Sequence, residues 1–189
     1  MAGTIVNVKQ YDDYILQIYD VYVVSQWYNG SYIDCNADDV NTGFYNTPLI
    51  VTAQGGGSYA ARICDVATNG GKSDWYLPSN EELTAMYQKG LLNSSETYWS
   101  STEVDSNLAY SINGSTGVFS QSDKSISTYA AIKTRKEYTS TFVTVDRMKI
   151  QSKDAPILRG GENNADEDVY KMLGGVNGIS KNSNILSNE

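Results

Sequence analysis

The sequence predicts an α+β domain with two helices flanking a small mixed or antiparallel sheet of short strands, followed by an extended C-terminal tail. Three observations predict it. Residues 4–33 alternate β-branched and aromatic residues with polar ones, which indicates two or three strands. A capped helix start follows Pro78. Beyond Asp154 the chain is rich in Gly, Ser and Asn, so it cannot bury enough apolar surface to offset its ordering entropy alone.

These observations divide the chain into three parts. Residues 1–137 are the domain, and residues 138–154 add one further strand with alternating apolar side chains. Residues 155–189 are an extended assembly tail, which we expect neighbouring chains of a large assembly to hold in place.

The helix predicted over residues 80–89 has the clearest local signature. Pro78 fixes φ and lacks an N–H, which ends the preceding extended segment and suits the entry to a helix. Ser79 and Glu82 form an S-x-x-E capping box, in which the hydroxyl and the carboxylate each satisfy an unpaired backbone N–H. Gly90 is suited to the left-handed position that follows the last turn.

The remaining elements are short. Asn-Gly between Trp27-Tyr28 and Ser31-Tyr32-Ile33 indicates a hairpin, because both residues tolerate positive φ. Apolar runs bounded by turn residues indicate strands. The predicted elements are a hairpin at Asn29-Gly30, a buried strand at 49–51, a helix at 59–67, strands at 108–112 and 118–120, and a last strand at 127–135.

Two blocks, Gly71–Leu83 and Tyr98–Glu103, resemble the C-terminal domain family of collagen-like bacterial adhesins, which is similar to the formylglycine-generating-enzyme type of C-type lectin fold. The resemblance covers about residues 40–136. It departs at the closing strand, where the family has two arginines and this chain reads Ala131–Arg135. The residues that carry the resemblance are Trp75, Leu77, Pro78, Ser79, Glu82, Leu83, Tyr98, Trp99, Ser100, Ser101, Glu103 and Arg135.

The resemblance implies a C-type lectin-like fold whose recognition face lies in the loops and strand after Glu103. It does not imply the chemistry of the formylglycine-generating enzymes, because Cys35 and Cys64 do not match their reactive pair. The candidate ligand-binding residues are Asp105, Asn107, Tyr110, Asn113, Ser115, Phe119 and Tyr129.

Composition narrows the function classes. A net charge of −8 and a pI near 4.5 argue against a nucleic-acid binder or a protein of anionic membranes, since both use dense Lys and Arg. The start of the chain lacks the charged and apolar regions of a signal peptide. The 15 tyrosines, with many Ser, Thr and Asn, are typical of recognition surfaces, although strands also favour tyrosine.

The sequence favours a protein without catalysis, metal or cofactor. Without histidine, nucleophilic triads cannot form, and carboxylates such as Glu103 are more simply explained by structural hydrogen bonds. The acidic segment Asp34–Asp39 has the spacing of a calcium loop but lacks its required Gly and Glu, which favours a solvated turn. Gly55–Gly57 is expected to be a turn, and Cys35 and Cys64 to be reduced buried thiols.

We therefore expect a non-catalytic structural or recognition component of a bacteriophage virion, as a head decoration, fibre or tail protein, that recognises host surface glycan or protein. Its partners would be other virion proteins or sister subunits, bound through the tail. The alternative is a bacterial cell-surface or secreted adhesin domain. Two further possibilities are a receptor-binding protein diversified by a retroelement and, last, a glycan-processing enzyme.

Overall fold

The computed structural model describes residues 3–139. The predicted tail at 155–189 lies outside the described residues, as does the predicted strand at 138–154 apart from its first two residues. The elements are β1 (Ile5–Gln10), β2 (Tyr14–Val24), α1 (Gly43–Gln54), α2 (Ala60–Asp65), the 3₁₀ turn η1 (Asn69–Gly71), α3 (Asn80–Gln88), β3 (Thr97–Glu103), β4 (Leu108–Asn113), β5 (Phe119–Asp123) and β6 (Ala130–Tyr138).

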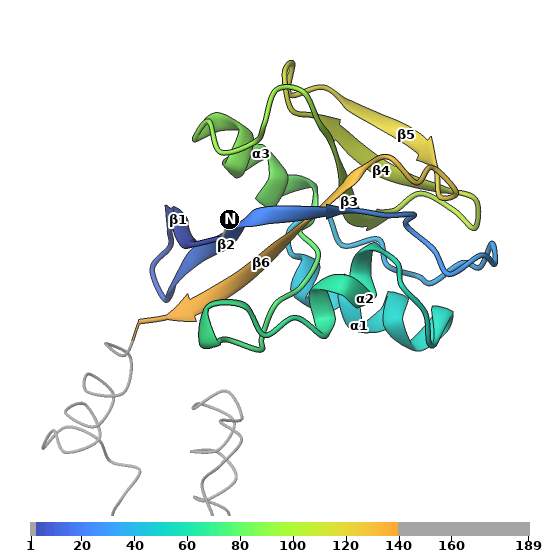
Figure 1. Cartoon of the computed structure of the whole chain (residues 1–189), viewed down its shortest axis with the longest axis horizontal. Helices are drawn as coiled ribbons and strands as arrows, with labels where there is room; N and C mark the ends of the chain where they lie inside the picture. The colour runs from blue at the N-terminus through green and yellow to red at the C-terminus, as the bar shows by residue number, and fades with distance from the viewer. Residues whose placement is uncertain (1–2, 140–189) are drawn as a thin grey trace, which may run out of the picture. The chain divides into compact units, whose positions relative to one another are not determined.

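The six strands form one mixed sheet in the order β1-β2-β6-β3-β4-β5 (Figure 1). Every neighbouring pair is antiparallel except β3 and β6, which run parallel and pair at Tyr98 and Ala130. The predicted α+β class with a mixed sheet is therefore confirmed. The prediction of two helices is wrong, because α1 is an additional one.

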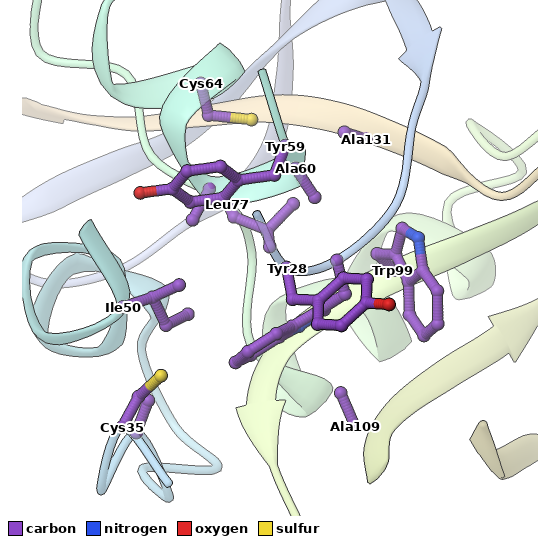
Figure 2. Packing of buried hydrophobic residues seen from close by; sticks show 13 residues of the cluster. Tyr28, Cys35, Ile50, Tyr59, Ala60, Cys64, Leu77, Trp99, Ala109 and Ala131 are labelled. Atoms are coloured by element: carbon purple, nitrogen blue, oxygen red, sulfur yellow. The ribbon is translucent and has the colours of Figure 1, made fainter. Parts of the chain in front are cut away.

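The sheet separates two hydrophobic clusters. Helices α1 and α2 lie on one side of the sheet and α3 lies on the other (Figure 1). Successive strand residues point to opposite faces, so Tyr98 joins the cluster under α3 while Trp99 joins the cluster under α1 and α2. Figure 2 shows the cluster under α1 and α2, which includes Tyr28, Ile50, Leu77 and Trp99.

Helix α3 is confirmed, and its capping box forms as predicted. The Ser79 hydroxyl accepts from the Glu82 N–H, and the Glu82 carboxylate accepts from the Ser79 N–H. Gly90 has a φ of 71°, the left-handed value expected after the last turn. The predicted helix at 59–67 is also found, as α2.

The predicted strand at 49–51 is wrong, because these residues lie inside α1. A short apolar triplet does not distinguish a strand from a buried helical segment. The helix is started instead by Thr42, whose side chain accepts a hydrogen bond from the Phe44 N–H. It continues through Pro48, although proline lacks the N–H of an ordinary helical hydrogen bond.

The predicted hairpin at Asn29-Gly30 is also wrong. Gly30 does adopt a positive φ of 108°, but no strand flanks the turn. The indole N–H of Trp27 donates to the Ser100 carbonyl at 2.8 Å, and the Asn29 N–H donates to the Gln54 side chain at 3.1 Å. These contacts with β3 and α1 take the place of cross-strand pairing. The later strands predicted around β4, β5 and β6 are confirmed.

The buried Glu82 carboxylate joins the starts of two helices. It accepts hydrogen bonds from the Ser79 N–H at 2.9 Å, the Gly43 N–H at 3.0 Å and the Tyr76 hydroxyl at 2.7 Å. Burial raises the pKa of Glu82, and these three hydrogen bonds oppose the shift. Gly43 has no room for a side chain, because a Cβ there would lie 1.8 Å from the Leu77 carbonyl oxygen. The N-termini of α1 and α3 therefore converge on one carboxylate, which both helix dipoles favour.

Replacing Glu82 by Ala is expected to lower the free energy of unfolding by about 3 kcal/mol or more, because three buried donors lose their acceptor. The matched control is Glu81→Ala, an exposed carboxylate in the same helical turn, expected to cost less than about 1 kcal/mol. Urea unfolding followed by circular dichroism measures both. Equal losses in the two variants would contradict the role given to Glu82.

Three tyrosines that are buried or partly buried predict a loss of stability at alkaline pH. Burial raises the pKa of Tyr14 and of Tyr98 from the ordinary 10 to about 12, and burial beside Glu82 raises that of Tyr76 further. Their contribution to stability is complete below pH 10 and is lost as the pH rises through 12, since the unfolded chain ionises first. The part of the absorbance rise at 295 nm that comes from these three tyrosines should therefore accompany loss of the circular dichroism signal. Complete tyrosine ionisation in a native protein would contradict this.

Candidate functional site

The ammonium of Lys124 is buried in a cage of oxygens at the end of β5. Its Nζ donates to the carbonyls of Ile33 at 3.1 Å, Asp105 at 2.6 Å and Ser106 at 2.8 Å, and to the Glu103 carboxylate. The side chain of Lys124 is 0% exposed and that of Glu103 is 3% exposed. Because a buried charge is costly unless it is paired and hydrogen-bonded, this arrangement satisfies both ions at once.

Glu103 adds contacts with the irregular segment that carries Ile33. Its second carboxylate oxygen accepts from the backbone N–H groups of Cys35 at 2.8 Å and Ala37 at 3.3 Å. Beneath the cage, the ring of Trp27 lies 4.6 Å from the Lys124 ammonium, within the range of a cation–π contact. The cage therefore joins the irregular segment after β2, the β3–β4 turn and the end of β5.

Above the cage, polar and aromatic side chains reach the surface. We call this surface the Lys124 rim. The Tyr32 hydroxyl donates to the Asp123 carboxylate at 2.8 Å, and the same carboxylate accepts from the Ser125 N–H and hydroxyl. The hydrogen bonds from Ser125 and Tyr32 lower the pKa of Asp123. The Lys124 rim consists of Tyr32, Asp105, Asn107, Asp123 and Ser125.

The rim is held in one arrangement by local hydrogen bonds. The Asp105 side chain accepts from the N–H groups of Asn107 at 2.7 Å and Leu108 at 2.8 Å, which closes the β3–β4 turn. Tyr32 is 46% exposed, and its ring lies 4.9 Å from that of Tyr28. The surface thus presents two carboxylates, one amide and a hydroxyl beside an aromatic ring, in loops that are already ordered.

The structure brings together only part of the predicted recognition face. Asp105 and Asn107 lie on the Lys124 rim. Asn113 and Ser115 lie at the opposite end of β4, where the Asn113 side chain accepts from the Ser115 N–H. Tyr110 is half-buried in the middle of β4, opposite Gln121.

The two remaining predicted residues pack against the core. Phe119 is half-buried against the cluster under α3, and the ring of Tyr129 lies 4.8 Å from that of Trp99. The predicted face is therefore split between the two ends and the two sides of the β4–β5 pair. Sequence reasoning missed Tyr32, Asp123, Lys124 and Ser125, because a single lysine in a polar turn carries no pattern that marks it as buried.

The residues that carry the adhesin resemblance lie in the core or form hydrogen bonds and ion pairs between elements. Trp75 and Trp99 are buried. Ser101 donates its N–H to the Pro78 carbonyl at 2.7 Å, which fastens β3 to the start of α3. Arg135 donates to both oxygens of Asp74, at 2.8 and 3.0 Å, and although burial opposes it, this ion pair holds the pKa of Asp74 below its ordinary value. These motif residues therefore serve the scaffold.

The other candidate chemical groups also have structural partners. Asp34 and Asp39 accept hydrogen bonds from backbone N–H groups two residues later, and among residues 3–139 no cluster of acidic or cysteine side chains could hold a metal ion. Gly55 ends α1 with a φ of 71°. Cys35 and Cys64 are free and buried, and burial raises the pKa of Cys64 to about 12. Within the described part of the chain, no helix is long and apolar enough to cross a membrane.

No protein-family model matches the chain, and no curated protein gives a significant match. The resemblance to the collagen-like adhesin domains therefore stays a prediction.

Replacing Lys124 by Met is expected to lower the free energy of unfolding by about 3–5 kcal/mol, because it leaves the Glu103 charge buried without its partner. The matched control is Lys72→Met. Lys72 pairs with Glu137 across 3.5 Å where both side chains are about 40% exposed, so its loss should cost less than about 1 kcal/mol. Urea unfolding measures the losses, and hydrogen exchange should show faster opening of the β3–β4 turn in K124M. Similar losses in both variants would contradict the cage.

Proposed function

We propose that this protein is a non-catalytic recognition protein whose domain has the C-type lectin-like fold of the collagen-like adhesin family. The observation that carries the proposal is the Lys124 rim. Its residues lie on three segments that are distant in sequence, and the buried ammonium of Lys124 cross-links these segments. Such a surface binds with a small loss of conformational entropy, since its loops are already fixed. Its tyrosine, asparagine, serine and aspartate side chains are those that recognition loops use.

The two buried carboxylates, Glu103 and Glu82, are fully hydrogen-bonded within the domain, which supports a role without catalysis. Glu103, the strongest candidate for acid–base chemistry, has one oxygen on Lys124 and the other on the N–H groups of Cys35 and Ala37. Glu82 is held by Ser79, Gly43 and Tyr76. A general acid or base needs a proton that it can exchange with substrate, and these groups are committed to the fold.

The proposed setting is a bacteriophage virion, as a head decoration, fibre or tail component, with host surface glycan or protein as the ligand. The net charge of −8 supports a ligand other than nucleic acid or an anionic membrane. Contacts of residues 155–189 with other virion proteins or sister subunits belong to this proposal. A bacterial cell-surface or secreted adhesin domain is the second candidate, and it uses the same rim. Mass spectrometry of purified phage particles distinguishes the two.

The binding proposal is tested with the fluorescently labelled full chain on an array of bacterial polysaccharides and lipopolysaccharides and on intact bacterial cells. Asn107→Ala and Tyr32→Ala on the rim are expected to weaken binding about tenfold or more, equivalent to ~1.4 kcal/mol. Asn113→Ala at the opposite end of β4 is the matched control and should bind as the wild type does. Binding lost in N113A but kept in both rim variants would overturn the assignment of the rim.

A further inference from the structure

The segment that carries Tyr32 has no regular secondary structure to hold it. Residues 25–42, all within the described part of the chain, form neither helix nor strand, so no ladder of backbone hydrogen bonds fixes Tyr32 on the Lys124 rim. On the C-terminal side of Tyr32, the Lys124 ammonium holds the Ile33 carbonyl at 3.1 Å. The position of Tyr32 therefore requires a second attachment on its N-terminal side.

Gln54, the last residue of α1, provides this attachment, although it is only 4% exposed. Its side-chain oxygen accepts from the Asn29 N–H at 3.1 Å, and its amide nitrogen donates to the Ser31 carbonyl at 3.3 Å. The same nitrogen donates to the Cys35 sulfur at 3.7 Å. The main-chain carbonyl of Gln54 also accepts from the Asn29 side-chain amide. One residue of α1 thus binds three residues of the segment.

Gln54 is itself held in place because α1 is attached to the rest of the domain along its length. At the start of the helix, the Gly43 N–H donates to the buried Glu82 carboxylate at 3.0 Å. In its middle, the Thr47 hydroxyl accepts from the Leu77 N–H at 3.0 Å. A side chain on such a fixed helix positions a loop more precisely than contacts between two loops do.

The segment around Tyr32 can move once it is detached from α1. Gly30 lies between Asn29 and Ser31 with a φ of 108°, and a Cβ there would meet nothing within 4 Å beyond its chain neighbours. Asn29 and Ser31 are exposed, so water can satisfy their backbone groups after loss of the Gln54 amide. That loss should therefore open the segment locally without unfolding the domain.

We propose that Gln54 is a positioning residue of the recognition site, which holds residues 29–33 so that Tyr32 stays on the Lys124 rim. Gln54 is buried and acts through Tyr32, whose hydroxyl donates to the Asp123 carboxylate at 2.8 Å and so joins the segment to β5. The importance of Gln54 for binding rests on the function proposed for the rim. Its attachment of the segment is tested without a ligand.

The ligand-free test uses the two native thiols of the full chain as reporters. Burial raises the pKa of Cys35 to about 11, so iodoacetamide reaches a reactive thiolate there only when the segment opens. Gln54→Met keeps the length of the side chain but removes its hydrogen bonds, and we expect it to speed Cys35 labelling about tenfold or more. Labelling of Cys64, buried under α2, should stay unchanged.

Thr47→Val is the matched control, because it also removes a buried hydrogen bond of α1 but to Leu77, outside the segment. It should not favour labelling of Cys35 over Cys64. Loss of the Gln54 hydrogen bond by itself raises the pKa of Cys35 and slows labelling, so a faster reaction in Q54M reports opening. Unchanged labelling of Cys35 in Q54M, or an equal rise at Cys64, would overturn the proposal.

A double-mutant cycle measures the effect on binding. The probe is the bacterial polysaccharide that the wild type binds most tightly on the array. Q54M is expected to weaken this binding about tenfold, to have no further effect when added to Tyr32→Ala, and to keep its full effect when added to Asn107→Ala. A general disturbance of the fold would weaken binding in both backgrounds, and that result overturns the positioning role.

The two measurements separate failure of this proposal from failure of the proposed function. Selective opening at Cys35 in Q54M, with a wild type that binds nothing on the array or on cells, contradicts the recognition function and supports the attachment of the segment by Gln54. Binding by the wild type that Q54M leaves intact contradicts the positioning role and supports the recognition function.

Discussion

The scaffold depends on how one buried carboxylate is hydrogen-bonded. Glu82 lies where α1, α3 and the segment carrying Tyr76 meet, and a charge at that depth persists only if several donors surround it. The donors are two helix N-termini and a phenol, so their positions relative to one another are fixed by the geometry of three hydrogen bonds. Tyr76 also bridges to Thr134 of β6. The carboxylate therefore ties the helices on both faces of the sheet to its central strand.

A second buried carboxylate, Glu103 at the end of β3, is stabilised in a different way. Glu103 is as deeply placed as Glu82, yet its main partner is the ammonium of Lys124 rather than a helix start. Strand β3 links the two solutions, because the Ser101 N–H binds the Pro78 carbonyl beside α3 while Glu103 leads into the cage. The rim is thus placed by the strand that also fixes α3. Its position follows from the core and is independent of any ligand.

The sequence predicted the elements whose signals are local. Helix α3 was predictable because Pro78, Ser79 and Glu82 determine its start through contacts within four residues. Helix α1 was not, since its inner side is held by distant partners such as Asp39 and Leu77, and its apolar triplet resembles a strand. The cage around Lys124 was equally beyond sequence reasoning. Its acceptors are mainly backbone carbonyls from two separate segments, and every residue carries a carbonyl, so residue identity does not reveal them.

Because the cage relies on main-chain carbonyls, its stability is largely independent of the side chains on the Lys124 rim. Ile33, Asp105 and Ser106 contribute main-chain oxygens to the cage, so their side chains are not needed to hold the ammonium. The residues that must be retained are Lys124 and Glu103, both buried and out of reach of a ligand. Asp105 and Asp123 on the rim still hold their turns through their side chains, whereas the exposed side chain of Asn107 closes no turn and can change while the loops beneath it keep their shape. The proposed recognition function gains from this division, because substitutions at exposed rim positions that close no turn cost little stability.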